Sequence, residues 1–92
     1  MIELTYRLTK GAVSENIAVR LSDVRRARGE ESPAPWDIGV TILWGDNVAF
    51  NHPLSGVDPL HAVELAAQFA SKYLAGRASD EGGVLDPPIP PP

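Results

Sequence analysis

The 92-residue sequence predicts an α+β protein, a four-stranded antiparallel β-meander with one C-terminal helix packed on one face. Two observations predict this class. Apolar and polar residues alternate in four stretches before residue 54, which is the period of half-buried strands. One later stretch, from Asp58 to about Ala75, is rich in alanine and leucine and has a helical pattern. A single helix covers one face of a sheet, so we expect the other face to be solvated.

The first two strands are predicted over residues 2–8 and 17–22, separated by a turn-prone stretch at residues 9–12. In the first, Ile2, Leu4 and Tyr6 alternate with polar residues. In the second, the large apolar residues Ile17, Val19 and Leu21 alternate with Ala18, Arg20 and Ser22. A long loop is predicted over residues 23–35, because its prolines interrupt regular ladder pairing.

The third and fourth strands are predicted over residues 36–44 and from Val48 to about His52. Gly45-Asp46-Asn47 tolerates positive φ and predicts a tight hairpin between them. Pro53 should end the fourth strand, because proline cannot donate to a ladder. The face expected to pack on the helix consists of Leu4, Tyr6, Ile17, Val19, Ile38, Val40, Ile42, Trp44, Val48 and Phe50.

The helix is predicted to begin at Asp58-Pro59 and to end at Gly76. An aspartate can accept from the free N–H groups of the first turn, and proline suits the first helical position. Glycine supplies a left-handed stop. Residues 1–77 are therefore expected to form a single α+β domain, and residues 78–92 a flexible acidic, proline-rich tail. Proline pairs at PxxP spacing leave open whether this tail is a recognition motif.

One segment of the sequence resembles a known group of proteins; it reads Ser55-Gly56-Val57-Asp58-Pro59-Leu60-His61-Ala62-Val63-Glu64-Leu65-Ala66. It resembles a family of small uncharacterised bacterial domains of unknown function, in which a Gly-Val-Asp turn opens an Ala/Leu-rich C-terminal helix after a β-meander. The similarity covers about the second half of the chain. It implies a bacterial protein of this fold, and it implies no activity and no catalytic residue.

Charge and composition narrow the function classes. The chain has 12 acidic and 8 basic residues. The charged residues among the last 14 positions are all acidic, so the net charge of residues 1–78 is close to zero. Nucleic acid is therefore a disfavoured partner, because its binding depends on many lysines and arginines. The absence of cysteine excludes disulfides and thiolate sites and favours the cytoplasm. No apolar stretch has the length that a membrane requires.

These observations favour a small non-enzymatic protein-interaction or accessory module. Edge strands and one open sheet face would be covered by another protein or by a second copy in a homodimer. The candidate interaction surface is the arginine group Arg25, Arg26 and Arg28, together with Leu43, the large apolar residue on the face expected to be open.

The alternative is a small-molecule-binding or catalytic domain with a pocket where the fourth strand meets the helix. His52, Asp58 and His61 could gather there as an acid–base or metal cluster. Their spacing is not diagnostic of a metal site, and Asp58 is better placed as a helix cap. The sequence therefore predicts no catalytic residue, no metal ligand and no cofactor.

Overall fold

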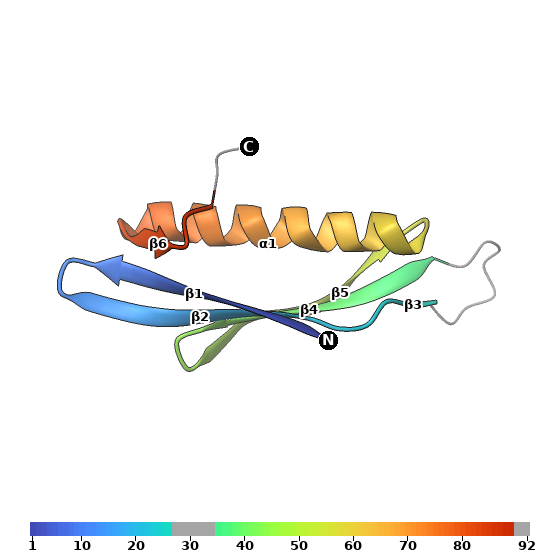
Figure 1. The fold of residues 1–92 in the computed structure, drawn as a ribbon, viewed down its shortest axis with the longest axis horizontal. Helices are drawn as coiled ribbons and strands as arrows, with labels where there is room; N and C mark the ends of the chain where they lie inside the picture. Colours follow the sequence, from blue (N-terminus) through green and yellow to red (C-terminus); the bar gives the residue numbers. More distant parts are fainter. Residues whose placement is uncertain (27–34, 90–92) are drawn as a thin grey trace.

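The computed structural model describes residues 1–26 and 35–89 as an antiparallel sheet with one helix across one of its faces (Figure 1). The α+β class, the antiparallel sheet and the C-terminal helix are confirmed. The sheet has six strands, whereas the sequence predicted four. The strands are β1 (Ile2–Lys10), β2 (Val13–Leu21), β3 (Arg25–Arg26), β4 (Trp36–Trp44), β5 (Asn47–Gly56) and β6 (Val84–Asp86), and the helix is α1 (Pro59–Glu81).

The four long strands form the predicted meander, and the two short strands extend it. β1 pairs with β2, β2 with β4, and β4 with β5. The β1–β2 and β4–β5 turns each contain a glycine with positive φ, at Gly11 and Gly45. β3 pairs with the first residues of β4, and β6 pairs with the last part of β1. Residues 27–34 of the predicted long loop lie outside the described part of the chain.

The core lies between the helix and one face of the sheet. The helix contributes a stripe at every fourth residue, and four of its five members are alanines, which let the helix lie close to the strands. The buried hydrophobic residues of the sheet come from β1, β2, β4 and β6, at positions that point to the helix. The buried set is Leu8, Ile17, Val19, Leu21, Ile38, Val40, Ile42, Trp44, Ala62, Ala66, Ala70, Leu74, Ala78 and Leu85.

Two residues predicted to be in the core are exposed. The register of β4 and β5 shifts after Ile42, so Ala49 is an extra residue in β5. This β-bulge turns Val48 to the face opposite α1, where it is 62% exposed. Leu4 keeps the predicted parity but is 45% exposed, because α1 packs mainly on β4 and β5 and leaves the first half of β1 uncovered.

The helix begins as predicted and ends later. Asp58 Oδ1 accepts a hydrogen bond from the His61 N–H, and Pro59 occupies the first turn. The helix passes Gly76 and ends at Gly82, whose φ is 69°. β6 then follows, so the segment expected to be a tail does not begin at residue 78. Within residues 1–26 and 35–89, no helix is both long enough and apolar enough to cross a membrane.

Candidate functional site

The arginine group predicted as an interaction surface begins on β3. Arg25 lies opposite Asp37 of β4, and the Arg26 guanidinium lies 5.7 Å from the centre of the Trp36 ring. Successive residues of a strand point to opposite faces, so Arg25 and Arg26 do not form one patch. Arg28 lies outside the described residues.

Leu43 lies on the face of the sheet that α1 leaves open, within an apolar row that crosses three strands. Ala18 of β2 lies beside Leu43, and Val48 of β5 lies on its other side. We call Ala18, Leu43 and Val48 the open-face row. The sequence predicted Leu43 as an isolated large apolar residue here, because alternation alone places Val48 on the other face. The β-bulge is what brings Val48 into the row.

The neighbouring row on the same face is polar and internally paired. Arg20 Nε donates to Glu3 Oε1 at 2.7 Å. Thr41 Oγ1 donates to Asn51 Oδ1 at 3.1 Å. The registers Glu3↔Arg20, Arg20↔Thr41 and Thr41↔Asn51 place these four side chains directly beside the open-face row. The face therefore has an apolar row bordered by paired polar groups.

The histidines and aspartate of the alternative pocket are used in local contacts. Asp58 caps α1, and His61 Nδ1 accepts a hydrogen bond from the Val57 N–H at 3.0 Å. His52 lies on β5 and its ring centre is 5.4 Å from that of Phe50. Among residues 1–26 and 35–89, no group of three or more His, Cys, Asp or Glu side chains is placed to hold a metal ion.

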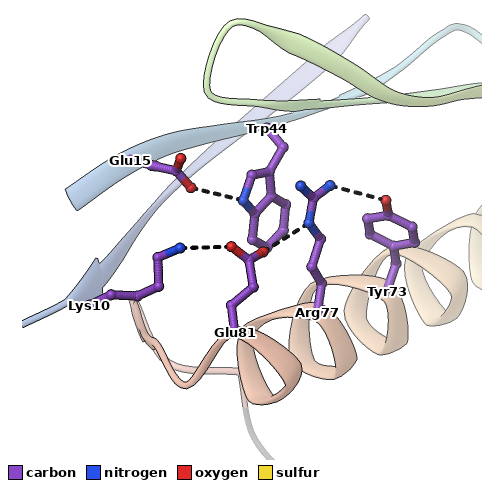
Figure 2. Close-up of polar contacts among 6 residues, drawn as sticks. All are labelled: Lys10, Glu15, Trp44, Tyr73, Arg77 and Glu81. Carbon is purple, nitrogen blue, oxygen red and sulfur yellow. Dashed lines mark hydrogen bonds and ion pairs between the residues drawn. The ribbon is translucent and has the colours of Figure 1, made fainter. Parts of the chain in front are cut away.

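A polar cluster that the sequence did not predict joins the end of α1 to the β1–β2 hairpin (Figure 2). Glu81 stands at its centre, accepting from Lys10 Nζ at 2.8 Å and from Arg77 Nε at 2.9 Å. The Arg77 guanidinium also lies over the Trp44 ring, 4.2 Å from its centre. We call this the hairpin-end cluster; it consists of Lys10, Glu15, Trp44, Tyr73, Arg77 and Glu81.

The charges of the hairpin-end cluster are mutually balanced. The hydrogen bond to Glu81 raises the pKa of Lys10. The hydrogen bonds from Lys10 and Arg77 lower the pKa of Glu81. Both groups are thus held in their charged forms, whereas a general acid or base needs a pKa near the working pH. The cluster is best explained as a clamp between helix and sheet. Its i,i+4 pair, Arg77 and Glu81, is visible in the sequence once the helix is extended past Gly76.

The ion pairs of Glu81 in the hairpin-end cluster predict how the stability of the fold depends on pH. Because the folded state lowers the pKa of Glu81 from its ordinary 4.5, the carboxylate stabilises the fold above pH 4.5, and this contribution is lost as the pH falls through the lowered value. We expect Glu81→Gln to lower the urea midpoint at pH 7, and the difference from the wild type to shrink below pH 4.5.

The matched control is Asp80→Asn, which removes the same charge from the adjacent residue. Asp80 is exposed and makes no ion pair within the described part of the chain. Its urea midpoint should follow that of the wild type at each pH. A Glu81→Gln curve parallel to the wild-type curve from pH 7 to pH 3 would contradict the assignment of the clamp.

An apolar groove lies between α1 and the uncovered part of β1. Leu4 and Tyr6 of β1 form one wall, Ala67 and Ser71 of α1 form the other, and Ile89 closes part of it. The volume of about 100 Å³ is below the range typical of small-molecule pockets. Its lining offers few polar groups to orient a substrate.

Comparisons with known proteins supply no relative for this chain. No protein-family model matches it, and neither a curated protein nor a solved structure does. The resemblance of residues 55–66 to small uncharacterised bacterial domains carries no activity with it.

Proposed function

We propose that the protein is a small non-enzymatic interaction module that binds a partner protein through the open face of its sheet. The observation that carries this proposal is the open-face row. Ala18, Leu43 and Val48 lie side by side on three paired strands, and Val48 is held outward by a β-bulge. Bulges that turn a side chain outward are frequent near functional surfaces.

The surroundings of the row suit a protein interface. A typical interface has an apolar centre and a polar rim that stays partly solvated. Here the rim is the paired set of Glu3 with Arg20 and Thr41 with Asn51. Because these groups already satisfy one another, a partner can dock on the row without leaving a buried charge unpaired.

The contacts of the ionisable groups favour binding over catalysis. Asp58 and His61 are engaged at the start of α1, and Glu81 is engaged in the clamp. The alternative function, a small-molecule or catalytic site around His52, Asp58 and His61, gains no support from these contacts. It would need side chains free to meet a substrate.

The test is affinity capture from lysate of the native organism with the wild type and Val48→Asp. A carboxylate at the centre of an apolar contact should weaken a specific partner roughly tenfold or more. Gln68→Glu is the control, because it adds the same charge on an exposed position of α1. Circular dichroism establishes that both variants are folded.

A stoichiometric partner that is retained by Gln68→Glu, lost with Val48→Asp and stable at high salt supports the proposal. A partner captured equally by all three proteins would contradict it. Loss at high salt alone would assign binding to charged residues such as Arg25 instead of the open-face row, because salt screens exposed charges.

A further inference from the structure

The first half of β1 is a sheet edge with a free side. β6 pairs with Arg7, Leu8 and Thr9 only, so residues 2–6 have no second strand beside them within the described part of the chain. β5, at the other side of the sheet, carries Pro53 and the bulge. Proline and bulges are the usual protections of an edge against pairing, and residues 2–6 have neither.

This edge is also apolar on the helix side. Ile2 is 55% exposed and Leu4 is 45% exposed, although both have the parity of core residues. Leu4 and Tyr6 line the groove beside α1. A strand added to β1 would cover these side chains as well as the edge itself.

We propose that this strand is β1 of a second copy, paired antiparallel about a two-fold axis at Leu4. In this register Leu4 faces Leu4 of the other copy, Ile2 faces Tyr6, and Glu3 faces Thr5. Residues with the same parity oppose each other in this register. The apolar side chains of Ile2, Leu4 and Tyr6 therefore meet on the helix side of the sheet, and the polar side chains of Glu3 and Thr5 meet on the open face. The pairing uses residues 2–6 of each copy and stops before Arg7, which already pairs with Asp86 of β6, so Met1 of the second copy has to leave the ladder there.

The charges of β1 favour this orientation. Glu3 lies near its start and Arg7 near its end, both on the open face of the sheet. In the antiparallel arrangement the diagonal neighbours of Glu3 are Arg7 and Glu3 of the second copy, so two Glu3–Arg7 contacts accompany one Glu3–Glu3 contact. A parallel arrangement in register would set like charges directly opposite each other. The result is a continuous sheet across two copies, which hides both free edges. This pairing leaves Ala18, Leu43 and Val48 free and shares only the rim residue Glu3 with the proposed partner surface, so it is tested separately from the proposed function.

Disulfide trapping tests the register directly, because the protein has no cysteine of its own. Directly opposed residues of antiparallel strands have Cα atoms about 4.5–5.5 Å apart, which is within the range of a disulfide. We expect Leu4→Cys to form a covalent dimer under mild oxidation. Val48→Cys, exposed on the opposite edge strand, is the control and should stay largely monomeric.

Sedimentation of the purified protein from micromolar to millimolar concentration provides the second readout. The wild type should approach twice the 9.9 kDa of one chain, and Leu4→Lys, which sets two ammonium groups together at the axis, should remain monomeric. Val48→Lys should dimerise like the wild type. A monomeric wild type, a dimer that survives Leu4→Lys, or equal trapping of Leu4→Cys and Val48→Cys would overturn the proposal. Because only purified protein is used, failure here leaves the capture experiment on the open-face row unaffected.

Discussion

Replacing Gly56 with alanine should destabilise the protein by about 3 kcal/mol, because the added methyl group has no space. Gly56 is buried at the end of β5, where the chain turns toward α1. An added Cβ would lie 2.5 Å from the Ala62 nitrogen and 2.9 Å from the His61 carbonyl carbon. Both are backbone atoms of the helix, which cannot rotate away. The first turns of α1 would have to move off the sheet.

Thermal unfolding checks this result, with a fall in Tm of roughly 15 °C expected for a chain of this size. Gly76→Ala is the matched control. Gly76 is exposed on α1, and an added Cβ there meets no atom within 4 Å. Alanine is the better helix former, so this variant should gain about 0.5–1 kcal/mol. If both variants shift Tm in the same direction, the close approach of Gly56 to the helix is wrong.

Leu74→Ala should cost about 3 kcal/mol through the cavity it leaves. Leu74 is the large residue in a buried helix stripe whose other members are alanines, and it is 1% exposed. With alanine at Ala70 and Ala78 on either side, no long neighbour on the stripe can fill the space. Urea unfolding should show a lower midpoint with a similar dependence on urea concentration.

Leu60→Ala is the control for Leu74→Ala, since it makes the same change in the same helix. Leu60 is 68% exposed in the first turn. We expect a change within about 0.5 kcal/mol, as is usual for surface positions. Equal losses in the two variants would mean that the buried stripe does not face the sheet as described.

The four long strands and the start of α1 were predictable because local signals and tertiary packing agree there. Alternation over Trp36–Trp44 matches a strand with neighbours on both sides. Asp58-Pro59 caps the helix as its sequence indicates. In these segments the hydrophobic period and the capping residues act over a few neighbours, which is the range that a single sequence reveals.

The errors occur where distant residues override a local signal. Gly76 indicates a helix end, yet Arg77, Ala78 and Glu81 hold the following turn against the sheet, and this outweighs the cost of one glycine in a helix. Pro53 indicates a strand end, yet β5 continues to Gly56 because an edge strand needs no donor on its outer side. β6 has only three residues, too few to show a period.

The candidate surfaces were partly predictable for the same reason. Leu43 follows from the parity of β4, but its neighbour Val48 depends on a register shift between strands. The hairpin-end cluster joins Lys10 to Glu81, which are 71 residues apart. No local pattern connects those positions, so their contact appears only when the helix and the β1–β2 hairpin are packed together.

The pairing of β6 with β1 has a consequence for synthesis on the ribosome. The chain emerges from its amino end, so β1 and β2 are available to pair long before residues 84–86 leave the exit tunnel. Throughout that interval Arg7, Leu8 and Thr9 lack the strand that pairs with them in the folded protein, and Leu8 lacks its partner Leu85. A nascent chain therefore presents a longer unpaired edge of β1 than the folded protein does, and that edge shortens only when β6 is in place.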